Sequence, residues 1–193
     1  MARIGVLAIQ GDFAAHASTL REAGAEVREV RKAAELREVD GLVLPGGEST
    51  TLLKFILNPE FGYLDAFQEF HRAGKPMLAT CAGLILLARE VSNPPQFSFG
   101  FLDVGVERNA YGRQRESFET VGEGYLHGKP EPLKMVFIRA PRIIRIGPEV
   151  ERLADWQGEP VMVRQGTILG ASYHPELTGD LAVHRYFLDM VKP

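Results

Sequence analysis

The sequence predicts an α/β protein with a mostly parallel central sheet and an antiparallel extension. Through the first half of the 193-residue chain, short apolar runs bounded by turn residues alternate with amphipathic stretches, which is the pattern of βαβ units. From residue 97 onward the apolar runs become shorter and follow one another between turns, which favours antiparallel strands. An amphipathic segment at 180–191 closes the chain as an expected helix.

The first half contains alternating expected strands and helices. The strands are short apolar runs at 3–9, 26–30, 41–44 and 77–80. The helices have apolar residues at helical spacing and lie at 13–23, 50–57, 63–73 and 84–88. Gly24 and Gly74 directly follow two of these helices, as expected for helix ends, and Asn58-Pro59 separates the second helix from the third.

The second half reads as strands separated by turns. We expect these strands at 101–106, 118–121, 135–138, 143–146, 160–164 and 167–173. The chain shows no internal repeat, low-complexity tract or linker. We therefore expect one domain that spans residues 1–193.

Composition excludes several classes of function. The net charge of −3, with basic residues scattered along the chain, gives no electrostatic reason to expect nucleic acid or a membrane as partner. The apolar start is too short to cross a bilayer and has no signal-peptide cleavage pattern. A single cysteine suits a reducing compartment, so we expect a cytoplasmic protein.

That cysteine, Cys81, follows an expected parallel strand and precedes an expected helix. Open α/β sheets bind their ligands at this carboxyl edge. The segment 79–83, ATCAG, resembles a nucleophile elbow, in which small neighbours let strand and helix approach. A lone cysteine is more often a small buried apolar residue, but here the amide of Ala82 and the helix N-terminus favour a nucleophile.

A base and its orienting group follow another expected strand, in the segment 172–176, SYHPE. His174 lies at the same edge as Cys81 and can accept its proton, while Glu176 can fix the imidazole tautomer. The other histidines, at positions 16, 71, 127 and 184, lack such a setting and are expected on the surface or in packing roles. The sequence has no cysteine cluster or HExxH spacing, so we predict no metal and no cofactor.

Together these residues resemble class I, triad-type glutamine amidotransferase domains, over nearly the whole chain. More narrowly, four segments resemble the glutaminase subunit of pyridoxal 5'-phosphate synthase: LAIQG at 7–11, PGGESTT at 45–51, ERNAYG at 107–112 and FIRAP at 137–141. The resemblance implies a flavodoxin-like, three-layer fold. One departure is Ala79, where many related glutaminases have glycine two positions before the cysteine.

The resemblance implies a reaction and roles for residues. Cys81 attacks the side-chain amide carbon of L-glutamine, His174 accepts the thiol proton and returns it to departing ammonia, and Glu176 orients His174. Water then hydrolyses the cysteine thioester to L-glutamate. The oxyanion donors map onto the backbone amides of Gly47 and Ala82. The glutamine site maps onto Gly46, Gly47, Glu48, Arg108, Ile138 and Arg139.

The same resemblance implies a partner. Ammonia passes to a separate (β/α)8-barrel subunit that makes pyridoxal 5'-phosphate, a form of vitamin B6, from ribose 5-phosphate and glyceraldehyde 3-phosphate. Gln10-Gly11 and the first helix are the expected interface elements. The Gly46-Gly47 pair allows the peptide to reorient, which would keep activity weak until the partner sets the turn.

Several alternatives stay open. The chain can serve another acceptor, such as the imidazole glycerol phosphate synthase system, or it can be a flavodoxin-like binding module without activity. Each residue of the glutamine site also has a structural explanation. Gly46 and Gly47 can form a simple turn, Glu48 can cap the next helix, Arg108 and Arg139 can be surface charges, and Ile138 can be core.

Overall fold

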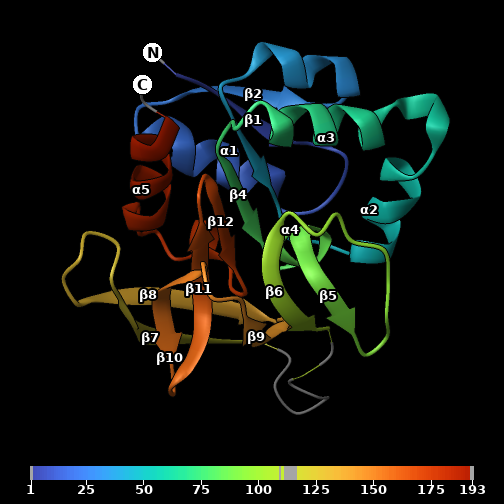
Figure 1. Ribbon diagram of the computed structural model, residues 1–193. Helices are drawn as coiled ribbons and strands as arrows, with labels where there is room; N and C mark the ends of the chain where they lie inside the picture. Colours follow the sequence, from blue (N-terminus) through green and yellow to red (C-terminus); the bar gives the residue numbers. More distant parts are fainter. Residues whose placement is uncertain (1, 109, 111–116, 192–193) are drawn as a thin grey trace.

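The computed structural model describes residues 2–108, 110 and 117–191 (Figure 1). The strands are β1 (Arg3–Leu7), β2 (Glu26–Val30), β3 (Gly41–Leu44), β4 (Met77–Thr80), β5 (Ala88–Ser92), β6 (Leu102–Glu107), β7 (Ser117–Gly124), β8 (Glu131–Ile138), β9 (Arg142–Ile146), β10 (Glu151–Trp156), β11 (Glu159–Gln165) and β12 (Ile168–Ala171). The α-helices are α1 (Phe13–Glu22), α2 (Ser49–Ile56), α3 (Tyr63–Arg72), α4 (Ala82–Leu87) and α5 (Ala182–Val191). Short 3-10 helices are η1 (Ala33–Glu38), η2 (Pro59–Phe61) and η3 (Pro175–Leu177).

The strands form one large sheet and one small sheet. The large sheet has the order β2-β1-β3-β4-β12-β11-β10-β7-β8. Its first five strands are parallel, and every pair from β12 to β8 is antiparallel. In the small sheet, β6 pairs with β5 in parallel and with β9 antiparallel. The fold is therefore a parallel α/β core continued by an antiparallel extension.

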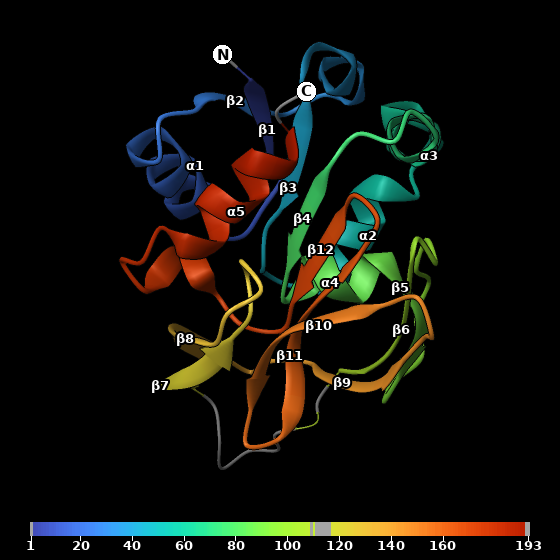
Figure 2. The same cartoon turned by 60° about the vertical axis from the view of Figure 1, so that its left-hand side comes forward.

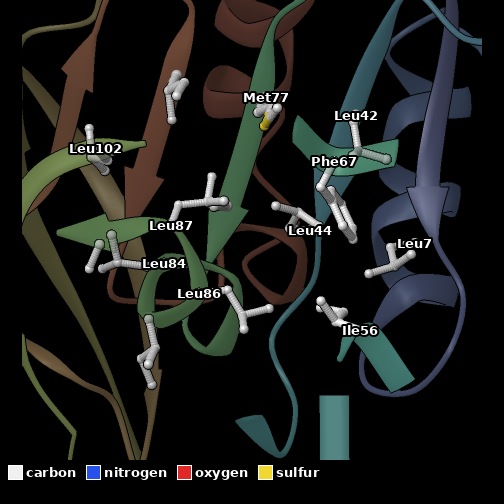
Figure 3. Packing of buried hydrophobic residues seen from close by; sticks show 14 of the residues in the cluster. Leu7, Leu42, Leu44, Ile56, Phe67, Met77, Leu84, Leu86, Leu87 and Leu102 are labelled. Carbon is white, nitrogen blue, oxygen red and sulfur yellow. The ribbon is translucent and has the colours of Figure 1, made fainter. Parts of the chain in front are cut away.

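Helices cover both faces of the parallel part of the sheet. Helices α1 and α5 lie on one face, and α2, α3 and α4 lie on the other (Figure 2). Each face has its own cluster of buried apolar side chains. On the second face, side chains of β3 and β4 meet Phe67 from α3 and leucines from α4 (Figure 3). This arrangement gives three layers, helix, sheet and helix.

Burial on both faces explains why the parallel strands are apolar throughout. Successive residues of a strand point to opposite faces. In β3, Leu42 and Leu44 join the cluster under α2, α3 and α4, whereas Val43 joins the cluster under α1 and α5. In β4, Leu78 belongs to the α1 and α5 side, so Thr80, two residues later, faces that side as well.

The predicted architecture is confirmed, and most predicted elements lie within two residues of their observed bounds. The strands expected at 26–30, 41–44 and 77–80 have the expected bounds. Two strands, β5 and β10, and the short 3-10 helices η1, η2 and η3 were not predicted. The expected helix at 84–88 begins earlier, at Ala82, and ends at Leu87, because Ala88 starts β5. The second half is not wholly antiparallel, since β5 and β6 run parallel.

Among the described residues, no helix is long and apolar enough to cross a membrane.

Phe67 is a test of the core on the α3 side. Its ring is fully buried and packs on Tyr63 and Phe99, so truncation leaves a cavity that its neighbours fill only in part. We expect Phe67→Ala to lower the free energy of unfolding by about 3–5 kcal/mol, measured by urea denaturation. Phe61→Ala is the control, because Phe61 is 44% exposed. Equal losses in the two variants would contradict this account of the core.

Candidate active site

The site lies where three neighbouring parallel strands end. Strands β3, β4 and β12 are adjacent in the large sheet, and their carboxyl ends meet at one edge. Leu44 of β3 is in register with Ala79, and Ala171 of β12 is in register with Thr80. The segments that follow these strands carry the Pro-Gly-Gly turn, Cys81 and His174. The register therefore brings the three segments together.

Cys81 occupies a strained turn between β4 and α4. Its φ of 47° and ψ of −105° are unusual for a residue with a side chain, and its side chain is nearly buried, at 7% exposure. The Cys81 amide donates to the carbonyl of Ala171 at 2.9 Å, which ties the turn to β12. At Gly83 an added Cβ would lie 2.2 Å from the carbonyl oxygen of Leu44. Gly83 thus lets α4 pack directly against the end of β3, as the elbow pattern predicts.

His174 and Glu176 form a buried pair beside the cysteine. His174 Nδ1 lies 2.7 Å from Glu176 Oε1, and the side chains of His174 and Cys81 both lie against Gly46 and line one cavity. The backbone amide of His174 donates to the carbonyl of Val136 at 2.8 Å, so β8 also fixes its position. The structure therefore brings together the three residues predicted to form the triad.

Electrostatics favour a proton on this histidine. Burial lowers the pKa of His174, but hydrogen bonds and charge attraction with Cys81 and Glu176 outweigh burial and raise it to about 10. Burial raises the pKa of Glu176, while its hydrogen bond with His174 opposes that rise. Because the carboxylate holds Nδ1–H, the Nε2 atom is left to exchange a proton with the thiol.

Gly46 packs against the cysteine and the imidazole. An added Cβ at this position would lie 2.4 Å from Cε1 of His174 and 3.1 Å from Cβ of Cys81. Any side chain here would displace the imidazole. The absence of a side chain at Gly46 is thus a geometric requirement of the triad.

The Gly46-Gly47 turn is held by residues that follow β1 and by the last residue of β4. The amide of Gly46 donates to Thr80 Oγ1 at 3.1 Å, and its carbonyl accepts from the amide of Asp12 at 3.2 Å. The amide of Glu48 donates to Gln10 Oε1 at 3.0 Å. The predicted interface segment Gln10-Gly11 therefore lies directly against the predicted oxyanion turn.

A cavity of about 240 Å³ opens beside Cys81 and His174. Five of the predicted glutamine-site residues line it: Gly47, Glu48, Arg108, Ile138 and Arg139. Gly46 lies behind this wall, against the imidazole, and Ala82 is buried at the start of α4. The size of the cavity and its mixture of charged and backbone groups suit a small amino acid.

The charged residues around the cavity differ in their local roles. Arg108 donates to Ser49 Oγ at 3.0 Å and to Thr50 Oγ1 at 3.4 Å, at the start of α2. Arg139 has a φ of 43°, a rare conformation for a side-chain-bearing residue. Asn109, Tyr111 and Gly112 of the segment 107–112 lie outside the described residues.

Glu48 caps α2, which is the structural role that the sequence analysis left open for it. Its carboxylate accepts hydrogen bonds from the amides of Thr50 and Thr51, at 2.9 and 2.7 Å. Hydrogen bonds from these two residues, the Thr50 amide first, outweigh desolvation and hold the pKa of Glu48 at about 2. Its prediction as a glutamine ligand stays a prediction.

Asp12 was not singled out from the sequence. Its Oδ2 lies 3.4 Å from His174 Nδ1, and it lines the cavity. It follows β1, which is the neighbour of β3, so only the order of the strands places it at the site. His16, expected in a surface or packing role, is fully buried and its Nε2 lies 3.2 Å from Glu176 Oε2.

Within the described ranges, one group of side chains is close enough together to hold a metal ion. Ligand atoms of Asp12, His174 and Glu176 lie within 4.8 Å of one another. An ion there would have to displace the 2.7 Å hydrogen bond between His174 and Glu176. The prediction that the site uses no metal stays a prediction.

The fold and this site define a class of protein. A cysteine at a strand-to-helix elbow, an imidazole and a carboxylate at the edge of a parallel sheet are the arrangement of a triad-type cysteine amidase. The family model of the SNO glutamine amidotransferase family matches residues 6–193. The chain belongs to the SNO glutamine amidotransferase family, which confirms the predicted relationship.

Relatives and solved structures agree with this membership. A protein of Koribacter versatilis named pyridoxal 5'-phosphate synthase subunit PdxT is 53% identical over 98% of this chain and 96% of its own length. One of the same name from Thermotoga neapolitana is 50% identical over 98% of this chain and its full length. A crystal structure of a glutamine amidotransferase superposes with a TM-score of 0.89, with 46% identity over 97% of this chain and 98% of that chain.

The cap of α2 predicts a pH-dependent loss of stability. The folded-state pKa of Glu48 is about 2, below its ordinary 4.5, so its carboxylate stabilises the fold above pH 4.5 and loses this effect as pH falls toward 2. We expect Glu48→Gln to cost about 0.5–1 kcal/mol at pH 7, with the charge contribution discounted for exposure, and less at pH 3. Thermal denaturation at both pH values measures this difference. Glu22→Gln, on the exposed end of α1, is the control, and an equal cost of Glu48→Gln at both values would contradict the prediction.

Proposed function

We propose that residues 1–193 act as a single glutaminase domain that hydrolyses L-glutamine and delivers ammonia to a pyridoxal 5'-phosphate synthase subunit for vitamin B6 biosynthesis. The observation that carries this proposal is the meeting of Cys81, His174 and Glu176 beside a cavity of amino-acid size. The PdxT relatives, which are about half identical over nearly the whole chain, support the choice of acceptor.

In the proposed reaction, Cys81 is the nucleophile. Cys81 gives its thiol proton to His174, whose raised pKa favours holding it, and Sγ then attacks the amide carbon of the glutamine side chain. The tetrahedral intermediate collapses as His174 donates this proton to the leaving nitrogen, which departs as ammonia. Water, activated by His174, then cleaves the thioester and releases L-glutamate. Glu176 keeps Nδ1 of His174 protonated throughout, so that Nε2 carries out both transfers.

The proposed oxyanion donors are the amides of Ala82 and Gly47. Ala82 is the first residue of α4, where helix geometry leaves an amide without an intrahelical partner. The peptide between Gly46 and Gly47 has its carbonyl engaged by the Asp12 amide. A rotation of this peptide would change where the Gly47 amide points, and the two glycines allow such a rotation.

The cavity supplies groups for the rest of the substrate. The guanidinium groups of Arg108 and Arg139 suit the α-carboxylate of glutamine, and the carboxylate of Glu48 suits its α-ammonium. We propose that backbone groups of Gly46, Gly47 and Ile138 make the remaining polar contacts with glutamine.

The proposed partner is the (β/α)8-barrel subunit of the synthase, in a hetero-oligomer in the cytoplasm. Gln10 and Gly11 are its proposed contacts, and they support the turn that carries the oxyanion amide. An added Cβ at Gly11 would lie 1.8 Å from the carbonyl oxygen of Gly46, so a displacement of this segment is transmitted to the Gly46-Gly47 peptide. Docking of a partner here would thereby set the turn and activate glutamine hydrolysis.

Glutamate release tests the proposed function. We expect weak activity from the isolated chain and a clear increase on addition of the barrel subunit of pyridoxal 5'-phosphate synthase. Cys81→Ala should lower turnover by at least about 10³-fold with an unchanged circular dichroism spectrum, because no other thiol is present. Undiminished activity of the isolated chain would contradict partner activation. No activity with a bound barrel subunit would favour another acceptor, such as the imidazole glycerol phosphate system, or a module without activity.

Gly47→Ala tests the proposed oxyanion turn. Gly47 has a φ of 150°, which alanine rarely adopts, and an added Cβ would lie 2.5 Å from Gln10 Oε1, so alanine would strain the turn and displace the Gln10 side chain that holds it. We expect kcat to fall by about 10²-fold, as for the loss of one oxyanion donor, with a smaller change in KM. Gly74→Ala is the matched control, because Gly74 also has a positive φ, 66°, and has open space around it. Equal activity of the two variants would rule out a role for the Gly47 turn.

A further inference from the structure

A buried chain of polar side chains lies behind the proposed triad. His16 on α1 places Nδ1 3.0 Å from Nε2 of His184 on α5. The other nitrogen of His16, Nε2, lies 3.1 Å from Thr80 Oγ1 and 3.2 Å from Glu176 Oε2. His16, His184 and Thr80 are fully buried within a layer that is mostly apolar. Such a group of polar residues is costly to bury unless its hydrogen bonds are made.

Both histidines of this chain are neutral at physiological pH. Burial lowers the pKa of His16 well below 6.5, and the neighbouring His184 and His174 add to this effect. Burial also lowers the pKa of His184, to about 4. Each neutral imidazole has one nitrogen that donates and one that accepts, so the proton positions can be derived from the neighbours.

The carboxylate of Glu176 selects the tautomer of His16. If Nε2 of His16 were unprotonated, its lone pair would face Oε2 at 3.2 Å, and the two would repel each other. A proton on Nε2 turns the same contact into an attraction, and Nδ1 then accepts the Nε2–H of His184. In this arrangement, and counting partners among the described residues, His184 Nδ1 is the one unpaired nitrogen of the two imidazoles, and it is a lone pair rather than a buried N–H.

The contact with His16 also gives the second oxygen of the Glu176 carboxylate a nearby hydrogen-bond donor. Its Oε1 is engaged by His174, whereas Oε2 is buried and has no well-aligned hydrogen bond among the described residues. The N–H of His16 is the close donor on that side, shared with Thr80 Oγ1. Thr80 Oγ1 also accepts the amide of Gly46. His16 therefore contacts the carboxylate of Glu176 directly and the glycine turn through Thr80.

We propose that His16 is a positioning residue, which holds Glu176 through Nε2–H and Oε2 and so fixes the carboxylate that orients His174. The proposal rests on the proposed function, because it assigns Glu176 its role in the triad. Two points hold a planar carboxylate in one orientation, whereas one point leaves it free to rotate. A rotated carboxylate would release Nδ1 of His174 and weaken the proton transfer between His174 and Cys81.

Two substitutions of similar polarity separate positioning from packing. The side-chain amide of glutamine reaches about as far as Nε2 of histidine, and that of asparagine about as far as Nδ1. His16→Gln therefore keeps a donor near Glu176, and His16→Asn keeps only the contact with His184. His127→Gln is the control, because His127 is an exposed histidine that packs on Tyr186.

Two measurements are needed on each variant. The first is kcat and KM for glutamine in the complex with the barrel subunit. The second is the rate at which iodoacetamide alkylates the isolated chain at pH 7, which reports on Cys81 alone because the chain has a single cysteine. We expect His16→Asn to lower kcat and the alkylation rate about tenfold, as for one hydrogen bond to a charged group, with KM within about twofold. His16→Gln should recover most of both rates.

Equal rates in the Asn and Gln variants, whether both normal or both reduced, would overturn the proposal, since a purely structural role does not distinguish them. Wild-type protein that is alkylated rapidly but releases no glutamate would instead count against the proposed function. In that case the alkylation rates of the two variants still decide whether His16 positions Glu176.

Discussion

The close approach of Gly46 to the imidazole is the constraint on which the rest of the site depends. A Cβ at this position would lie 2.4 Å from His174 Cε1, so the turn after β3 can cover the cysteine and histidine only as glycine. The parallel register sets this approach, because it aligns the ends of β3, β4 and β12 at one level. A shift of one residue in any of these strands would separate the three segments and exchange the side chains that belong to the two cores.

The helix layer formed by α1 and α5 both provides an apolar core and carries polar contacts to the site. Most of it is an apolar core, but Thr80, His16 and His184 carry a line of hydrogen bonds through it to Glu176. The alternation of β4 makes this possible, because Thr80 points to the same side as Leu78. The helix layer thus holds the polar groups of the site from behind, while α2 and α4 border the cavity from the other side.

Much of the fold and of the site was predictable because it depends on local signals. Parallel strands buried on both faces are apolar throughout, and Cys81 and His174 each directly follow such a strand. Strand β5 was missed because Arg89 and Glu90 interrupt its apolar pattern, and β10 because it begins with two exposed charged residues. Asp12 was not singled out, and the contact of His16 with Glu176 was not predicted, for another reason: their positions depend on the order of the strands and on which face of α1 is buried, and neither is encoded locally. For Glu48 the sequence left two roles open, and the helix geometry confirms the capping role.

The groups that make this site are spread over almost the entire polypeptide, and the hydrogen bond between His16 and His184 joins residues 168 positions apart. Such distant contacts raise contact order, and their loop-closure entropy is lost before the contacts can form. Cys81, the proposed nucleophile, therefore emerges during synthesis before His174 and Glu176, and it lacks its proposed base until the chain has folded. The proposed triad is therefore complete only after residues 81, 174 and 176 have been made and brought together, so amide cleavage would be the last property that this polypeptide acquires.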